Sequence, residues 1–186
     1  MPRNIEIKAR VSNVEALISR AAEIADDGPF EINQDDTFFH CPSGRLKLRM
    51  FSPEEGELIF YQRADYSGPK ESFYLRSPTT APEEMREALS LAYGQVGRVR
   101  KQCTLFLVGR TRIHLDIVAG LGHFLELEVG LGEREAPQVG IREAHELMCR
   151  LGVDDSELVD CASVDLLKVV GASNKIMQPT SDDARG

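Results

Sequence analysis

The sequence predicts an α+β fold in which eight or nine short antiparallel strands are interrupted by three helices. Several segments alternate strictly between apolar and polar residues, which is the period of a strand with one buried face. Other segments carry helix-capping signals, and glycine-containing turns join three late strands into a meander. The chain has 186 residues, of which 42% are hydrophobic and 28% charged, and this suits one domain with its own core.

The first half of the chain is expected to hold one helix among several strands. Ser12 and Glu15 have the spacing of a capping box, which predicts a helix from there to about Asp26, and Gly28-Pro29 ends it. Alternation and turn residues predict strands at 3–11, 33–40, 44–50, 58–63 and 72–76.

The second half is expected to hold the other two helices and the meander. Pro82 in a first turn and Gly94 after a last turn predict the second helix. Strands are expected at 98–108, 111–118 and 123–131, a third helix at about 139–151, and a short helical stretch at 155–170. No linker divides the sequence, so residues 1–171 are predicted to form one domain, followed by a disordered polar tail at 172–186.

Charge and composition argue against several classes of protein. A net charge of −8 argues against a broad nucleic-acid-binding surface. No apolar run approaches the roughly 20 residues that cross a bilayer, and the first residues do not resemble a signal peptide, so we expect a cytoplasmic protein without a membrane partner. The four cysteines have no CxxC spacing, which argues against a zinc cluster and favours free thiols.

Charged residues lie on one face of several predicted strands. In the strand at 44–50 the basic residues share one face and the apolar residues the other. Each strand taken alone favours a polar face in water, but a closed sheet would bring all of these charges to one axis. The basic residues are Lys8, Arg45, Lys47, Arg49, Arg63, Arg76, Lys101 and Arg112, and the acidic ones are Glu6, Asp116, Glu126 and Glu128.

The mixture of charges in this set indicates a phosphorylated ligand with a divalent metal. Arg and Lys side chains bind phosphate oxygens, but carboxylates among them do not suit an anion alone. Carboxylates do suit Mg²⁺ or Mn²⁺ that bridges protein and phosphate. Glu126 and Glu128 would lie about 7 Å apart on one face, close enough to share a metal. Salt bridges to neighbouring strands explain this pair equally well.

Four ordered segments resemble the CYTH family, which groups class IV adenylyl cyclases with thiamine triphosphatases and is also called the triphosphate tunnel metalloenzymes. They lie at 4–8, 44–49, 112–116 and 121–128, and the resemblance runs from about residue 3 to 168. It implies a closed eight-stranded antiparallel β-barrel, the triphosphate tunnel, with flanking helices.

The resemblance also implies roles for individual residues. The family signature Glu-x-Glu-x-Lys falls on Asn4, Glu6 and Lys8, so the first acid is missing. Metal ligands for Mg²⁺ or Mn²⁺ are expected at Glu6, Asp116, Glu126 and Glu128. The family's basic tunnel positions fall on Arg45, Lys47, Arg49, Arg63, Lys101 and Arg112, and the charged strand faces add Lys8 and Arg76 to the expected phosphate-binding residues. Catalytic roles are expected at Lys8, Arg49 and Glu128.

These features favour a metal-dependent phosphohydrolase acting on a small triphosphate, whether inorganic triphosphate, a nucleoside triphosphate or thiamine triphosphate. A class IV-type adenylyl cyclase is the first alternative, although no residue set plainly seats a nucleobase. A non-catalytic module that binds a phosphorylated ligand is the second, because Cys103 and Ser163 replace an Arg and a Tyr of the family. A homodimer is compatible with the family but is not indicated by the residues.

Overall fold

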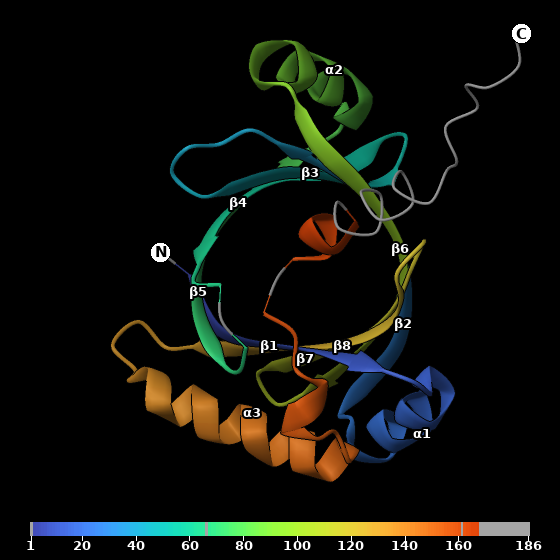
Figure 1. Cartoon of the computed structure of the whole chain (residues 1–186), viewed down its shortest axis with the longest axis vertical. Helices are drawn as coiled ribbons and strands as arrows, with labels where there is room; N and C mark the ends of the chain where they lie inside the picture. Colours follow the sequence, from blue (N-terminus) through green and yellow to red (C-terminus); the bar gives the residue numbers. More distant parts are fainter. Residues whose placement is uncertain (1, 66, 161, 168–186) are drawn as a thin grey trace, which may run out of the picture.

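Eight antiparallel strands close into a ring that surrounds a central axis (Figure 1). The computed structural model describes residues 2–65, 67–160 and 162–167. Within them the strand order around the ring is β1-β5-β4-β3-β2-β6-β7-β8, with β8 returning to β1. The predicted closed eight-stranded fold with flanking helices is therefore confirmed. The strands are β1 (Arg3–Val11), β2 (Asp27–Phe39), β3 (Arg45–Ser52), β4 (Glu55–Arg63), β5 (Lys70–Thr79), β6 (Gln95–Val108), β7 (Thr111–Val118) and β8 (Gly122–Leu131).

Three α-helices flank the ring, namely α1 (Val14–Ile24), α2 (Pro82–Tyr93) and α3 (Pro137–Leu151). The N-cap of α1 is Asn13, whose Oδ1 accepts a hydrogen bond from the Ala16 backbone at 3.0 Å. The capping box predicted at Ser12 is therefore wrong by one residue, because an Asn side chain caps as well as Ser and stands one position later.

Strand β2 is longer than predicted and begins at Asp27 rather than at residue 33. Helix α1 ends at Ile24, before Gly28-Pro29, and the chain passes directly into the sheet through a shift in register between Asp27 and Phe30. Gly28 has a φ of 106°, and a Cβ there would lie 2.7 Å from the Leu105 carbonyl oxygen. Only glycine fits this position, so the residue that was expected to stop a helix also begins a strand.

The stretch predicted to be helical at 155–170 divides into three parts within the described residues. A 3₁₀ turn at Asp155–Glu157 precedes an extended segment, and residues 163–167 form a short helix. The extended segment pairs with β1, since the Val159 N–H donates to the Lys8 carbonyl at 2.9 Å. Strand β5 pairs with β1 only as far as Glu6, so the later backbone groups of β1 need another partner. The predicted disordered tail lies outside the described residues.

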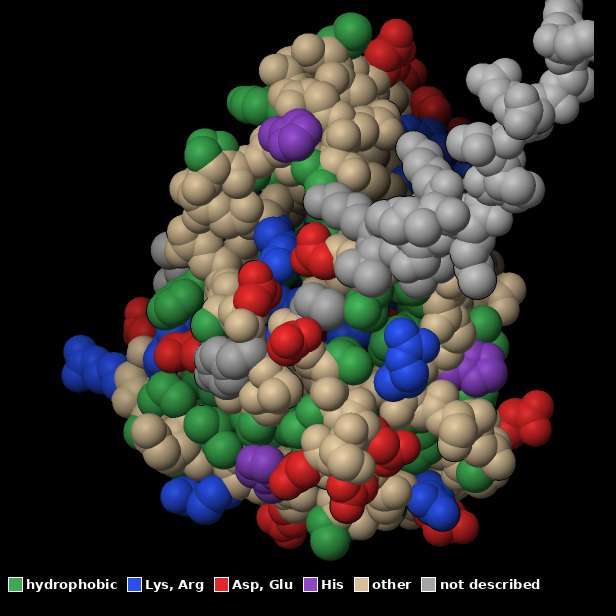
Figure 2. Space-filling view, in the orientation of Figure 1, with side chains coloured by type: hydrophobic (Ala, Val, Ile, Leu, Met, Phe, Trp, Pro, Cys, Tyr) green, Lys and Arg blue, Asp and Glu red, His purple; other side chains and the backbone are tan. Residues whose placement is uncertain are grey.

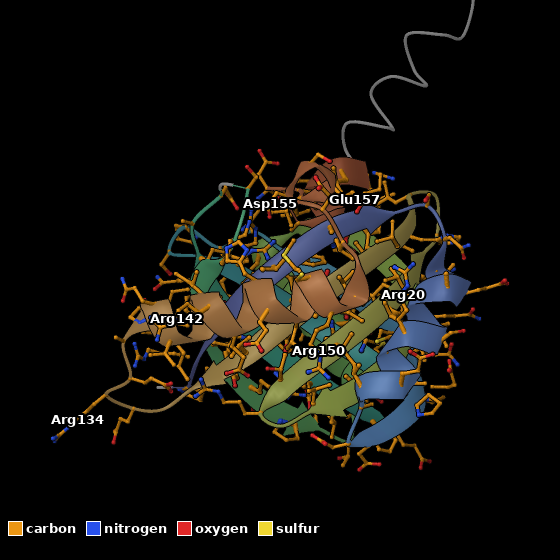
Figure 3. All side chains as sticks on the ribbon, turned by 90° about the horizontal axis from the view of Figure 1, so that it is seen from below. Arg20, Arg134, Arg142, Arg150, Asp155 and Glu157 are labelled. Carbon is orange, nitrogen blue, oxygen red and sulfur yellow. The ribbon has the colours of Figure 1, made fainter. Side chains whose placement is uncertain are left out.

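The apolar core lies outside the ring, between the sheet and two of the helices. Helices α1 and α3 lie across the outer face of β1, β7 and β8, as Figure 3 shows from below. Arg20 of α1, labelled there, donates to the Leu151 carbonyl at 2.7 Å and links the two helices. Buried side chains from both layers include Ile7, Leu17, Ile113, Leu125, Leu127, Leu147 and Leu151. Within the described residues no helix is both long and apolar enough to cross a bilayer.

Gly140 sets how closely α3 approaches the sheet. A Cβ at this position would lie 2.7 Å from Ile5 Cγ1 and 2.8 Å from Leu131 Cδ2. We expect Gly140→Ala to lower the free energy of unfolding by about 1–3 kcal/mol through overpacking, although Ala is the better helix former. Urea unfolding followed by circular dichroism measures the change.

Arg142→Ala is the matched control, because Arg142 is exposed on the same helix (Figure 3). An unchanged or raised stability of Gly140→Ala would contradict the close contact between α3 and the sheet.

Candidate functional site

The inward-facing side chains of the ring line a cavity of about 250 Å³. Because side chains alternate along a strand, the residues that face away from the apolar core face the axis. Seven Lys and Arg side chains and four Asp and Glu side chains line the cavity among the described residues, a net charge of +3 in a chain of net −8. The positive potential of this acidic protein is thus gathered inside the ring, and charged side chains are visible over the ring opening in Figure 2.

Ten of the twelve predicted site residues line this cavity. They are Glu6, Lys8, Lys47, Arg49, Arg63, Arg76, Lys101, Arg112, Glu126 and Glu128. Each strand taken alone left open whether its charged face points to solvent or into the ring. These residues point into the ring, because they come from seven of the eight strands and line one cavity.

The other two predicted site residues, Arg45 and Asp116, do not line the cavity. Arg45 lies at one mouth of the ring, where its guanidinium donates to Asp65 at 2.9 and 3.0 Å and to Asp165 at 3.0 Å. Asp116 is fully buried and accepts from Lys101. Neither side chain therefore faces the cavity, since Arg45 is held by Asp65 and Asp165 and Asp116 supports a lysine.

Ion pairs between strands, some of them neighbours and one across an intervening strand, hold the inner charges in place. Lys8 Nζ lies 2.6 Å from Glu126 Oε1, and Arg112 donates to Glu128 across the β7–β8 register. Arg63 donates to Glu6 at 2.8 Å. The salt bridges foreseen for Glu126 and Glu128 are therefore present within the tunnel itself.

These pairs keep the two late glutamates ionised. Burial opposes the charged form of Glu126, but Lys8 and Lys101 outweigh it and hold the pKa well below its usual value. Burial also opposes the charged form of Glu128, but His114 and Arg112 have the larger effect and lower its pKa. Both carboxylates are thus anionic oxygen donors at neutral pH.

Asp36 is a central residue that the sequence analysis missed. Its carboxylate accepts from Lys47 at 2.7 Å and from Arg49 twice at 2.8 Å, and its side chain is only 4% exposed. Burial raises the pKa of Asp36, but Arg49 and Lys47 more than offset this and leave it well below the usual range. The signal was available, because Asp36 alternates with Gln34 and Phe38 on the predicted strand at 33–40.

Lys47 is the cation whose charge is held least firmly. Burial and the neighbouring Arg49 lower its pKa to about 8, although Asp36 partly opposes them. At neutral pH the ammonium is still charged, and a bound anion would stabilise it further.

Cys103 is a buried thiol beside His114. Its Sγ lies 3.4 Å from His114 Nδ1, and no part of the residue is exposed. Burial, together with the nearby Asp116, raises the pKa of the thiol well above its usual value. A neutral, enclosed thiol of this kind is a packing residue rather than a nucleophile.

One end of the ring is closed by the described residues 158–160 and 162–167, here called the C-terminal segment. This segment lies within the ring opening in Figure 1. Val164 packs into an apolar cluster with Phe38, Val99 and Phe124. Ser163 lines the cavity, and its hydroxyl accepts from Lys8 at 2.6 Å. The segment therefore contacts the inner charges directly.

The carboxylates of the tunnel have the chemistry that Mg²⁺ or Mn²⁺ requires. Glu6 and Glu128 are direct partners in the β1–β8 register and line the same cavity, and Glu126 follows two residues away on the same face. Mg²⁺ commonly takes one or two protein carboxylates and completes its shell with phosphate oxygens and water, so a subset of these glutamates would be enough to hold it beside a phosphate.

The fold and the site together define a closed eight-stranded sheet around a basic cavity that also holds anionic carboxylates. A family model described as the CYTH domain matches residues 2–160. The chain therefore belongs to the CYTH domain family, and the resemblance seen in the sequence is confirmed.

Known proteins similar to this chain carry the same fold. Adenylate cyclase CyaB of Aeromonas hydrophila is 24% identical over 162 residues, which cover 83% of each chain. The structure of the PH1012 protein from Pyrococcus horikoshii OT3 has a TM-score of 0.78 at 22% identity and covers 88% of this chain and 98% of its own. A putative adenylyl cyclase from Hippeastrum, described as having a dominant triphosphatase activity, has a TM-score of 0.63 at 14% identity and covers 92% and 96%.

The triad of Asp36, Lys47 and Arg49 makes a prediction about stability. Asp36→Asn would leave two buried cations without their counter-ion, so we expect the free energy of unfolding at pH 7 to fall by about 3–5 kcal/mol. The lowered pKa of Asp36 means that its contribution is present above the unfolded value near 4 and is lost as the pH falls toward 2. Urea unfolding at pH 7 and at pH 3 measures both effects.

Asp35→Asn is the control, because Asp35 stands next in the chain but faces outward, with its side chain 25% exposed beside Arg98. We expect it to cost about 1 kcal/mol or less. Equal losses in the two variants would show that the inner triad has no special role.

Proposed function

We propose that this protein hydrolyses a triphosphate-containing substrate with the help of a divalent metal. The observation that supports the proposal most strongly is the net positive cavity in which carboxylates are interleaved with lysines and arginines. Cations alone would suit any anion, whereas this mixture suits a metal–polyphosphate complex.

Substrate binding is then an exchange of partners. Lys8, Arg63 and Arg112 are paired with Glu126, Glu6 and Glu128. Phosphate oxygens replace the carboxylates as acceptors for these cations, so the released carboxylates become available to a metal. Lys47, Arg49, Arg76 and Lys101 add further charge along the cavity, and the arginines can bind phosphate oxygens bidentately.

Glu6, Glu126 and Glu128 are the residues that would hold the metal. Asp116, expected to belong to this set, instead fixes Lys101, whose ammonium it accepts from. Mg²⁺ or Mn²⁺, when bound, would neutralise charge that develops on the transferred phosphoryl group.

In the proposed reaction a water oxygen forms a bond to the terminal phosphorus while the bond from that phosphorus to its bridging oxygen breaks. The products are inorganic phosphate and the shortened phosphate ester or diphosphate, and the proton of the water passes to a tunnel carboxylate or to solvent. Fixed cations stabilise the charge on both oxygens, so Lys8, Arg49 and their neighbours act mainly by positioning and electrostatics.

Cyclisation of ATP is the second candidate reaction, and it is favoured by the identity to the adenylate cyclase of Aeromonas hydrophila. It would require the ribose 3′-hydroxyl at the α-phosphate, with release of pyrophosphate. Hydrolysis requires only an aligned water, and the Hippeastrum neighbour described as a dominant triphosphatase supports it. Product analysis separates the two, since only cyclisation yields cyclic AMP. A non-catalytic binding role would give saturable binding and no product.

Glu126→Gln tests the role of the carboxylates. Loss of its charge should lower kcat/KM for triphosphate hydrolysis with Mg²⁺ or Mn²⁺ by about 100-fold or more. Release of inorganic phosphate measures the rate. Glu133→Gln, at an exposed position outside the tunnel, should behave as wild type. Wild-type turnover by Glu126→Gln would remove this residue from the mechanism.

The lowered pKa of Lys47 leads us to expect that activity declines at alkaline pH. Because its pKa is lowered to about 8, kcat/KM should decline as the pH rises above that value and the ammonium loses its proton. Lys47→Arg keeps its charge over the whole range and should remove the decline. A pH–rate profile of both proteins from pH 6 to 10 is the measurement, and parallel declines would assign the limit to another group.

A further inference from the structure

We propose that Ser163 accepts the terminal phosphoryl group of a bound triphosphate, so that the protein phosphorylates itself inside its own tunnel. The inference rests on the proposed function, which supplies the phosphoryl donor, and it adds a second acceptor beside water. It is carried by a serine hydroxyl that lines the basic cavity and contacts Lys8. The phosphoserine that forms would take the place of the terminal phosphate and slow further turnover.

Ser163 differs in chemistry from the other hydroxyl residues of the site. Among the described residues that line the cavity, it has the only aliphatic hydroxyl group, and the other hydroxyl groups are the phenols of Tyr61 and Tyr74. Burial raises the pKa of the Tyr61 phenol well above its usual value, so that phenol stays neutral. Phosphoryl transfer through a loose transition state needs a well-placed alcohol more than an ionised one.

The backbone on both sides of Ser163 is held in place. Ala162 and Val164 are only 5% and 3% exposed, and Val164 packs into a buried apolar cluster. Asp165 accepts a hydrogen bond from Arg45 at 3.0 Å. The C-terminal segment that carries these residues lies within the ring opening (Figure 1). The hydroxyl is therefore placed in the cavity before a ligand arrives, which favours it over a water molecule that must first be ordered.

Lys8 connects this hydroxyl to the phosphate that it receives. Lys8 Nζ donates to Ser163 Oγ at 2.6 Å and to Glu126 Oε1, also at 2.6 Å. An ammonium has three donors, so the serine contact can stay when a phosphate oxygen replaces Glu126. Two acceptors on one ammonium lie about 4–5 Å apart. A small movement then brings Oγ to within about 3–3.5 Å of the phosphorus, which is the distance for attack.

The proposed step is balanced by the donor itself. A bond forms between Ser163 Oγ and the terminal phosphorus while the bond from that phosphorus to its bridging oxygen breaks. The diphosphate part of the donor leaves with the electron pair, and the hydroxyl proton passes to solvent. The fixed cations that stabilise transfer to water also stabilise this transfer, because charge develops on the same phosphate oxygens.

A phosphoserine at this position would be held by the cavity in which it forms. It carries a charge of about −1.5 to −2 at neutral pH. The charged side chains of the described residues that line the cavity sum to +3. The new phosphate oxygens would lie beside Lys8, where the terminal phosphate of the next substrate binds under the proposed function. Turnover should therefore slow as Ser163 becomes modified.

The test incubates the full chain with Mg²⁺ and either ATP or inorganic triphosphate as the donor. Tandem mass spectrometry after an acid quench locates the phosphoryl group, because phosphoserine survives acid whereas phosphohistidine and acyl phosphates do not. We expect phosphorylation of wild type at Ser163 and a loss of about tenfold or more in Ser163→Ala. Ser156→Ala removes an exposed hydroxyl outside the tunnel and should be phosphorylated like wild type.

The time course of phosphate release gives a second measurement. Wild type should slow as Ser163 is modified, whereas Ser163→Ala should keep a steady rate while the donor is in excess. Ser163→Asp places a permanent negative charge beside Lys8, so its phosphate release should be about tenfold slower than that of Ser163→Asn, which is neutral and of similar size. Thermal melting confirms that each variant is folded.

Hydrolysis of either donor without phosphorylation of Ser163 would overturn this inference and leave the proposed function intact. Phosphorylation only at another residue, or at the wild-type level in Ser163→Ala, would overturn the inference in the same way. Phosphorylation of Ser163 without release of inorganic phosphate would support the inference and overturn the proposed hydrolysis. Absence of both reactions with both donors would overturn the two together.

Discussion

The structure depends on the mutual neutralisation of charges that a closed sheet turns inward. Moving an ion from water into a protein interior costs several kcal/mol unless it is paired. Asp36 supplies the paired negative charge for Lys47 and Arg49, and Asp116 supplies it for Lys101. The tunnel can therefore be assembled without a ligand, and its ion pairs hold the side chains in the arrangement that a polyphosphate would meet.

The outer face of the sheet stabilises the fold, and its inner face carries the candidate site. Strands β7 and β8 turn leucines and isoleucines outward beneath α1 and α3, and the alternate residues His114, Glu126 and Glu128 face the cavity. The stability of the ring comes from the outer face, where apolar burial is large. Changes at inner positions can thus alter chemistry while the fold is retained, which is consistent with one fold shared at 14 to 22% identity.

The sequence predicted the ring, the meander and most of the inner charges, because strict alternation assigns each residue of a strand to a face. The alternation of residues gave a wrong prediction where a contact with a residue distant in the sequence decides how a side chain or segment is placed. Arg45 alternates correctly with Lys47, but Asp65 and Asp165 hold its guanidinium at the mouth. The C-terminal segment has a helical pattern, yet unpaired backbone of β1 draws part of it into an extended form. Asp36 was not predicted, because its partners Lys47 and Arg49 lie on another strand and only the folded sheet brings the three together.

The polarity of the tunnel constrains how a substrate can react. Ser163 contacts Lys8 at the end of the cavity that the C-terminal segment closes, and the pair of Arg112 and Glu128 lies farther from that end. Under the proposed function, a substrate whose terminal phosphate lies beside Lys8 would be hydrolysed near Glu126, which is paired with Lys8, whereas cyclisation of ATP would occur nearer Glu128 and Arg112. The two candidate reactions thus use opposite ends of one charged channel. Which of them proceeds is decided by whether water at the inner end or the ribose hydroxyl at the outer end is better aligned with its phosphorus, because the fixed cations stabilise charge along the whole length.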